Sequence, residues 1–173
     1  MIVNIRYATM ADLDDIASVE SECFPVLEAA TKEEFEQRIK YYGNHFWLMF
    51  DDDKLIAFVD GFVTDEADLT DEMYENASMH NENGAWQMIF GVNTLPEYRR
   101  CGYAKELIKK AILDAREQNR RGLVLTCKES LVPYYSKFGF IDEGITDKST
   151  HGNVLWHQMR LDFELRNNGV KQI

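Results

Sequence analysis

The chain has 173 residues, of which 45% are hydrophobic and 12% aromatic, so it can bury one sizeable core and we expect a single domain. Its formal net charge of −11 argues against a nucleic-acid-binding protein, because phosphate backbones require a basic face. The sequence has neither an apolar run of about 18 residues nor a basic and apolar leader, so we expect a soluble, cytoplasmic protein that does not enter a membrane.

The first part of the sequence predicts two helices and three strands. Thr9 and Asp12 have the spacing of an N-cap with an acid in the first turn, and Thr31 and Glu34 have that of a capping box. The polar stretch 51–54 separates two apolar runs, so a hairpin is the simplest arrangement. In chain order, the predicted elements are a strand at 3–8, helices at 9–23 and 31–41, and strands at 45–50 and 55–63.

Charge is spread unevenly along the chain. Between Asp51 and Glu82 there are eleven acids and one base, whereas residues 99–128 hold nine of the nineteen lysines and arginines. The acidic segment 64–84 has little apolar periodicity, and we expect a long loop with one helical turn that covers a site. An acidic loop attracts cations, while the basic stretch favours one small anion.

The second part of the sequence predicts a further sheet and its covering helices. The stretch 86–95, WQMIFGVNTL, is almost continuously apolar, as in a strand buried on both faces, and Gly91 within it indicates a bulge or a close backbone approach. In chain order, the predicted elements are a strand at 86–95, an amphipathic helix at 103–115, a strand at 123–127, a short helix at 133–138, strands at 140–145 and 154–161, and a polar tail at 164–173.

The stretch 99–104, RRCGYA, joins a predicted buried strand to the clearest predicted helix. A helix N-terminus presents backbone N–H groups without internal partners, and Gly102 would let the backbone approach an anion closely. Neither GxGxxG nor GxxxxGK[ST] occurs in the sequence, so a dinucleotide fold and a nucleoside triphosphatase are not indicated. The stretch predicts a phosphate or pyrophosphate site; the alternative is a helix end with two surface arginines.

Two motifs in this part of the chain resemble one family. Arg99-x-x-Gly102-x-Ala104 resembles the (Q/R)xxGx(G/A) signature of the GNAT N-acetyltransferase superfamily. The stretch 125–140, LTCKESLVPYYSKFGF, is similar to the corresponding strand and helix of arylalkylamine (serotonin) N-acetyltransferases. The resemblance implies an α/β fold at 1–163 with a mixed, mostly antiparallel sheet, helices on both faces and splayed central strands.

The resemblance also implies acetyl-coenzyme A as the co-substrate. In this family the pyrophosphate lies on the turn before the helix, and the pantetheine arm pairs with the edge of the preceding strand. The residues implied for the cofactor are Val92, Asn93, Thr94, Arg99, Arg100, Cys101, Gly102, Tyr103, Ala104 and Lys105.

The implied reaction is direct attack of an amine on the thioester, with the developing oxyanion stabilised by a backbone N–H near Gly91. Tyr135 matches the family's catalytic tyrosine, which protonates the leaving thiolate; the alternative is a packed aromatic side chain. The acceptor pocket of the family corresponds here to Phe24, Pro25 and Leu27, for which core packing is an equal alternative. Met88, Phe90 and His151 are also assigned to it, and for His151 the alternative is an ordinary loop histidine.

The base that deprotonates the amine is not identified by the resemblance. The serotonin enzymes use two histidines at positions that are Met88 and Phe90 here, and neither residue can take a proton. The replacements that we consider are Glu22, Glu28, Asp60, His151 and water.

The sequence therefore favours an N-acetyltransferase acting on a small, cationic amine of the arylalkylamine or polyamine type. The alternatives are a GNAT enzyme acting on a peptide amine, an antibiotic or an amino acid, and a catalytically silent acyl-CoA-binding module.

Metal binding and disulfide formation are not predicted. The cysteines, Cys23, Cys101 and Cys127, are widely spaced and form no CxxC pair, so we expect reduced thiols. The four histidines are scattered without the spacing of metal ligands, and we expect no metal. The sequence leaves open whether the protein forms a homodimer.

Overall fold

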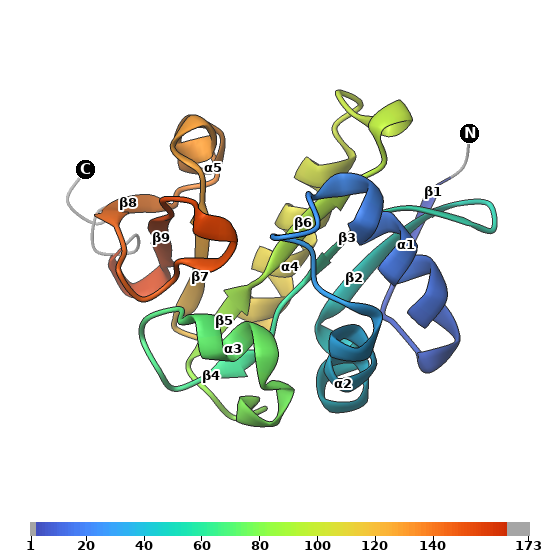
Figure 1. The fold of residues 1–173 in the computed structure, drawn as a ribbon. Helices are drawn as coiled ribbons and strands as arrows, with labels where there is room; N and C mark the ends of the chain where they lie inside the picture. Colours follow the sequence, from blue (N-terminus) through green and yellow to red (C-terminus); the bar gives the residue numbers. More distant parts are fainter. Residues whose placement is uncertain (1–2, 166–173) are drawn as a thin grey trace.

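The computed structural model describes residues 3–165, which form two sheets that diverge from a shared centre (Figure 1). The first sheet has the strand order β1-β2-β3-β6 and the second has the order β4-β5-β7-β9-β8. The strands are β1 (Val3–Arg6), β2 (Phe46–Asp51), β3 (Lys54–Asp60), β4 (Val63–Thr64), β5 (Trp86–Ile89), β6 (Gly91–Thr94), β7 (Gly122–Cys127), β8 (Ile141–Ile145) and β9 (His157–Asp162).

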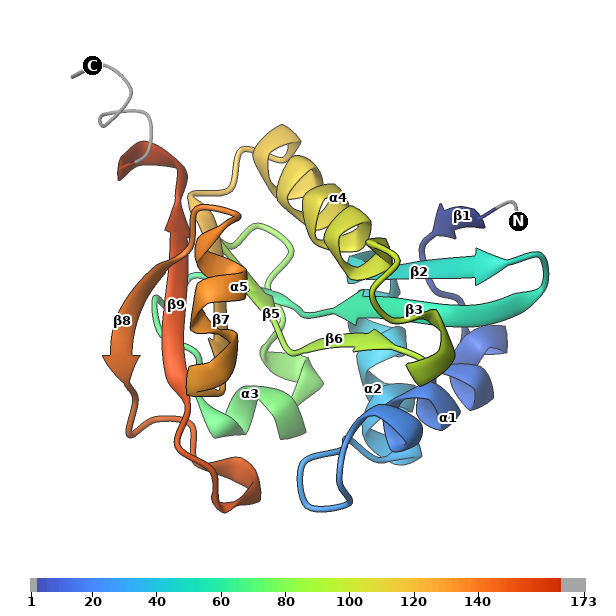
Figure 2. The same cartoon turned by 90° about the horizontal axis from the view of Figure 1, so that it is seen from above.

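All strand pairs are antiparallel except β5 with β7, so the predicted mixed, mostly antiparallel sheet is confirmed. The α-helices are α1 (Leu13–Cys23), α2 (Lys32–Tyr42), α3 (Asp71–Glu75), α4 (Tyr103–Glu117) and α5 (Val132–Ser136). Figure 2 shows α4 on one face of the first sheet and α1 and α2 on the opposite face. Of the predicted tail at 164–173, all but residues 164 and 165 lies outside the described residues.

Two apolar clusters hold these layers together, and they follow the alternation of side chains along β2. Phe46 and Leu48 point to the cluster beneath α1 and α2, whereas Trp47 and Met49 point to the cluster beneath α4. All four side chains are no more than 1% exposed. Because both faces of β2 are covered, its sequence is continuously apolar rather than alternating.

A local sequence signal explains where α2 begins. The hydroxyl of Thr31 accepts a hydrogen bond from the backbone N–H of Glu34 at 3.1 Å, and the Glu34 carboxylate accepts one from the N–H of Thr31 at 3.2 Å. This capping box starts α2 where the sequence predicts.

The predicted loop 64–84 contains α3 and a turn of 3-10 helix at Ala77–Met79.

Two predicted strands are wrong in extent because the chain crosses between sheets. The strand predicted at 55–63 ends at Asp60, and a side chain at Gly61 would lie 1.8 Å from the backbone oxygen of Met88. The strand predicted at 86–95 breaks at Phe90, whose N–H donates to the oxygen of Asp60 at 2.7 Å. Gly91 then begins β6 in the first sheet, instead of forming a bulge within one strand.

This break produces the predicted splay of the central strands. β5 pairs with β7 as far as Ile89 opposite Leu125, after which β7 continues without β5. β6 pairs with β3 alone and is the last strand of the first sheet. The free edge of β6 therefore faces the gap that opens between the sheets.

No helix among residues 3–165 has the length and apolar character needed to cross a bilayer.

Candidate functional site

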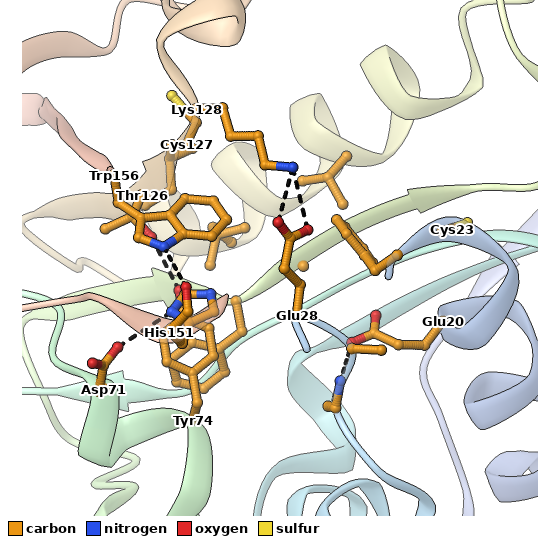
Figure 3. A pocket seen from close by; sticks show the side chains of 18 of the residues that line it. Glu20, Cys23, Glu28, Asp71, Tyr74, Thr126, Cys127, Lys128, His151 and Trp156 are labelled. Carbon is orange, nitrogen blue, oxygen red and sulfur yellow. Dashed lines mark hydrogen bonds and ion pairs between the residues drawn. The ribbon is translucent and has the colours of Figure 1, made fainter. Parts of the chain in front are cut away.

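A cavity of about 390 Å³ lies where the two sheets diverge. Its walls come from the end of α1, the loop 24–30, α3, the β5–β6 break, the end of β7, α5 and the loop before β9. Figure 3 shows that the polar side chains at this cavity come from both halves of the molecule. The loop 64–84 contributes Asp71, Tyr74 and Glu75 to one wall, in keeping with the prediction that it covers a site.

Glu20 is a buried acid at this cavity, and the sequence analysis missed it. It lies on the inner face of α1 with Ile16, Val19 and Cys23, at the spacing that apolar residues of a packed helix share. An acidic residue at a position where the helix pattern expects an apolar one is the sequence signal that could have identified Glu20. The side chain of Glu20 is 6% exposed, and one carboxylate oxygen accepts the N–H of Ala30 at 2.8 Å.

The pKa of Glu20 is raised to about 7. Burial is the main cause, because it disfavours the charged form, and the nearby charge of Asp60 acts in the same direction. The Ala30 N–H and the Arg38 guanidinium oppose this shift but do not cancel it. Glu20 therefore changes its charge near neutral pH.

Asp60 and Arg38 form an ion pair directly behind Glu20. Arg38 Nη1 donates to Asp60 Oδ2 at 3.0 Å, and Arg38 Nη2 donates to the backbone oxygen of Tyr74 at 3.0 Å. Both side chains are almost fully buried, at 3% and 0% exposure. Burial raises the pKa of Asp60, and Arg38 opposes that shift.

Several buried polar atoms converge beside Gly91 and lack protein partners at full hydrogen-bond geometry, although the Asn93 side chain lies close enough to Glu20 to oppose the rise of its pKa. These atoms are Glu20 Oε1, Asp60 Oδ1 and both polar atoms of the Asn93 side chain. A methyl group built on Gly91 would lie 3.0 Å from Asp60 Oδ1, 3.0 Å from Asn93 Nδ2 and 3.7 Å from Glu20 Oε1. Each unsatisfied buried polar group costs about 1–3 kcal/mol, so this arrangement suits a polar guest.

Aromatic rings line the opposite side of the cavity in a continuous series. Trp156 stacks on His151 with ring centres 4.5 Å apart, His151 lies 4.5 Å from Tyr74, and Tyr74 lies 4.8 Å from Phe90. His151 is fixed by Asp71, whose Oδ1 lies 3.2 Å from its Nδ1. The series runs from the loop before β9 to the strand break, and it offers flat apolar surface to a bound molecule.

Tyr135 lies on α5 and lines the same cavity from the second half of the molecule. Its ring packs against Tyr134 and Phe140 at centre distances of 5.2 and 6.2 Å, and the residue is 6% exposed. Burial, followed by the neighbouring Cys127, raises the pKa of Tyr135 well above its usual value. The phenol therefore stays protonated and can act as a hydrogen-bond donor.

The turn between β6 and α4 has the backbone shape that the sequence predicts for an anion site. Arg100 and Gly102 have φ values of +64° and +82°, in the left-handed region, and Gly102 is the N-cap of α4. A methyl group on Gly102 would meet no atom within 4 Å, so the backbone conformation is what requires glycine there. Arg99 is fixed at the end of β6 by a 2.9 Å hydrogen bond from its Nε to the Thr94 oxygen.

The residues predicted for cofactor and acceptor are arranged around this geometry. Val92 lines the cavity from β6, Asn93 is buried beside Glu20, and the stretch 99–105 forms the turn and the first residues of α4. Those predicted for the acceptor fall into two groups: Phe24, Pro25, Leu27, Phe90 and His151 line the cavity, whereas Met88 is fully buried in the core and does not.

The four candidate bases from the sequence have different surroundings. Glu28 and His151 line the cavity, but each is engaged with a charged partner, Lys128 and Asp71 respectively. Asp60 is fully buried behind Glu20, and Glu22 is exposed on α1 and does not line the cavity. Glu20 is a buried carboxyl group at the cavity with no cationic side chain bound directly to it among the described residues. Glu34 and Glu75 also line the cavity without an ion pair within residues 3–165, but Glu34 is half-buried and Glu75 is exposed.

Comparison with known proteins agrees with this geometry. Residues 13–140 match the model of the Acetyltransferase (GNAT) family. The chain belongs to this family. Serotonin N-acetyltransferase of Mesocricetus auratus is 30% identical over 93 residues, which are 53% of this chain and 43% of that protein. The match therefore spans less than half of that curated relative.

Solved GNAT structures share the fold at low identity. The loading GNATL domain of CurA from Lyngbya majuscula has a TM-score of 0.82 at 16% identity, covering 96% of this chain and all of that one. The PaiA N-acetyltransferase of Thermoplasma acidophilum, in complex with coenzyme A, has a TM-score of 0.69 at 17% identity, covering 94% and 100%. These likenesses establish the GNAT fold of this chain.

The GNAT domain also brings together two histidines that look scattered in the sequence. His45 and His80 each approach Glu82 Oε2 through Nε2, at 2.6 and 3.0 Å. The Nδ1 of His80 accepts the N–H of Val63 at 3.1 Å, so in the neutral ring the proton is on Nε2. Burial, followed by His45, lowers the pKa of His80, which favours that neutral ring. His80 Nε2 then has no lone pair for a metal, and this cluster is better described as a hydrogen-bonded group.

Proposed function

We propose that this GNAT domain, with the extent 1–163, transfers the acetyl group of acetyl-CoA to the amine of a small, cationic acceptor. The observation that carries the proposal is the meeting of three features at one cavity: the free edge of β6, the buried acid Glu20 and the phenol of Tyr135. An open strand edge pairs with an amide-containing arm, an acid near neutral pKa accepts a proton, and a neutral phenol donates one.

The residues of the β6–α4 segment fit a coenzyme A molecule. β6, with Val92, Asn93 and Thr94, is the last strand of its sheet, so the backbone groups on its outer edge would pair with the amide groups of the pantetheine arm, although the Thr94 oxygen already accepts Arg99 Nε. The turn formed by Arg99, Arg100, Cys101 and Gly102 precedes a helix of 15 residues, and with Tyr103, Ala104 and Lys105 it would hold the diphosphate. The bound thioester brings an activated acetyl group to the cavity.

Glu20 is our choice for the group that removes the proton from the amine. A primary amine with a pKa near 10.4 is almost entirely protonated at pH 7, so it must lose a proton before it attacks. Glu20 lies at the cavity with a pKa of about 7, so a large fraction of it is deprotonated at neutral pH. The ammonium proton passes to this carboxylate, directly or through one water, and the nitrogen then forms its bond to the acetyl carbon.

Tyr135 has the complementary role on the other side of the bond that breaks. As the carbon–sulfur bond cleaves, the sulfur gains negative charge, and the phenol of Tyr135 donates its proton or a strong hydrogen bond to it. Burial raises the pKa of Tyr135, but it raises the proton affinity of a thiolate formed in the same place as well. Backbone N–H groups near Gly91 polarise the acetyl oxygen during the attack.

The cavity wall supports an acceptor with a cationic head and an apolar body. The aromatic series Phe90, Tyr74, His151 and Trp156 would contact the body, while Glu20 and Asp60 favour the ammonium group. The acidic segment 64–84 raises the local concentration of cations by steering them. An arylalkylamine fits this combination better than a polyamine, which offers no flat surface.

An enzyme and a silent acyl-CoA-binding module differ in thiol release. The purified chain is mixed with acetyl-CoA and a panel of phenylethylamines, indolylethylamines, polyamines, amino acids and peptides, and free CoA is followed with a thiol reagent. We expect release with at least one arylalkylamine. If calorimetry shows that coenzyme A binds but no amine causes release of free CoA, the result supports the binding module instead. The sequence feature in favour of that module is the absence of the histidine pair of the serotonin enzymes at Met88 and Phe90.

A further inference from the structure

An ion pair crosses the mouth of the cavity between the two halves of the molecule. Lys128 Nζ lies 2.9 Å from Glu28 Oε1 and 3.3 Å from Glu28 Oε2, so it contacts both carboxylate oxygens. Glu28 is on the loop between α1 and α2, and Lys128 follows β7 in the second sheet (Figure 3). Both residues line the cavity.

The loop 24–30 is also in close contact with the loop that precedes β9. A methyl group on Gly152 would lie 2.7 Å from Glu28 Cγ and 3.6 Å from the Leu27 oxygen, so the Glu28 side chain packs directly against the backbone of Gly152. Gly152 has a φ of +71°, which a residue other than glycine rarely adopts. The Glu28 side chain is only 6% exposed, although it lies at the rim of the cavity. The two loops and the ion pair therefore cover the acceptor side of the cavity together.

The ion pair between Glu28 and Lys128 can form and break without disturbing the rest of the site. Lys128 is 43% exposed while Glu28 is 6% exposed, so the pair is only partly screened by solvent and should shift an equilibrium by at least about fivefold. It thus helps to hold the loop 24–30 against the second half of the molecule. Neither residue is needed for the proton transfers assigned to Glu20 and Tyr135.

We propose that Glu28 and Lys128 form a latch that sets the length of the acceptor, so that the cavity accepts a short amine and excludes an amine at the end of a peptide chain. Glu28 and Lys128 lie in the wall of this cavity of about 390 Å³, which the acceptor would share with the end of the pantetheine arm, so the ion pair leaves room for a short amine and limits the space for a continuing chain. This inference rests on the proposed function and narrows its substrate class. It assigns a specificity-determining role to a pair of residues that does not take part in the chemistry.

Charge-reversal variants test whether the attraction between Glu28 and Lys128 controls which acceptors are acetylated. The variants are Glu28→Lys, Lys128→Glu and the double reversal, and Lys32→Glu is the control because Lys32 pairs with Asp14 on the exposed surface outside the cavity. Each is assayed with a short arylalkylamine and with a tetrapeptide that has a free N-terminus. We expect each single reversal to raise kcat/KM for the peptide relative to the short amine by at least about fivefold. The double reversal should restore the wild-type ratio, and the control should not change it.

A second readout does not depend on acetylation. Cys23 and Cys127 line the cavity, and in a Cys101→Ser background their labelling by thiol reagents of increasing size reports how open the cavity is. Single reversals should speed labelling by the bulkier reagents, and the double reversal should slow it again. If labelling responds in this way but no amine is acetylated, the latch stands and the proposed function fails.

An unchanged acceptor ratio and unchanged labelling in both single variants would overturn the latch. So would a double reversal that behaves like the single variants, because the interaction between the two charges would then be irrelevant. A fall in affinity for coenzyme A, measured by calorimetry, in Lys128→Glu would also overturn it, since Lys128 would then belong to the cofactor site.

Discussion

Replacing Glu20 with glutamine should make the protein more stable and less active at the same time. Glutamine has nearly the shape of a protonated glutamate, and its side-chain oxygen can still accept the N–H of Ala30. The change removes the ability to take a proton and removes the cost of a buried negative charge near Asp60. Stability and activity should therefore move in opposite directions.

The size of the stability effect follows from the pKa of Glu20. Its value of about 7 in the folded protein, against 4.5 for the ordinary side chain, means that the folded state binds this proton more tightly than the unfolded state. The contribution of Glu20 to the free energy of unfolding is therefore fully present below pH 4.5 and is lost as the pH rises through 7, by roughly 3 kcal/mol in all. Above pH 7 the Glu20→Gln variant should be more stable by up to this amount, or about 6–10 °C in Tm.

The assays are thermal unfolding at pH 5 and pH 8 and steady-state acetylation across the same range. We expect the gain in Tm at pH 8 to shrink strongly at pH 5. Turnover should fall by about 10²–10⁴-fold, and the rise of kcat/KM near pH 7 should disappear. Glu22→Gln, an exposed acid on the same helix, is the matched control and should change neither quantity. A Glu20→Gln variant with full turnover and the wild-type pH profile would refute the role of Glu20.

Three further substitutions test separate parts of the site. Tyr135→Phe should lower kcat by about 10²-fold and leave the affinity for coenzyme A unchanged in calorimetry, and full turnover would remove the proposed acid. Gly102→Ala forces a side chain into a left-handed backbone, so it should cost about 1 kcal/mol of stability and also weaken coenzyme A binding. Gly144→Ala, at a glycine with a φ of +90° where an added methyl group would meet no atom within 4 Å, should show a similar stability loss without the binding loss. Arg38→Met leaves Asp60 buried without its partner, and we expect a loss of about 3–5 kcal/mol in denaturant unfolding, which a wild-type midpoint would contradict.

The sequence predicted the features of this protein that depend on neighbouring residues. The capping box of Thr31 and Glu34 determines the start of α2, and the three- and four-residue spacing of apolar residues determines α4. The turn at Gly102 could be predicted for the same reason, because a glycine before a helix has a local conformational cause. The family motifs then implied the splayed sheet, which the structure confirms.

The features that the sequence did not predict depend on residues distant along the chain. The break at Phe90 needs the oxygen of Asp60 as a hydrogen-bond partner, and the end of β3 is set by the closeness of Gly61 to Met88. Glu20 was missed for a similar reason. Its position on the apolar stripe of α1 indicates burial, but its raised pKa depends on how completely distant elements bury it and, secondly, on Asp60, which is 40 positions away in the sequence.

The charges around Gly91 connect the choice of base with the choice of acceptor. Glu20 and Asp60 are two buried carboxyl groups that share one buried cation, Arg38. If both were ionised, the group would carry a net negative charge away from water, so near neutral pH it tends to keep one proton. An ammonium group that enters the cavity neutralises that charge and makes the retained proton unnecessary. Burial and the negative charge of Asp60, which raise the pKa of Glu20, therefore also favour a positively charged acceptor, which then gives its proton to the carboxylate that attracted it.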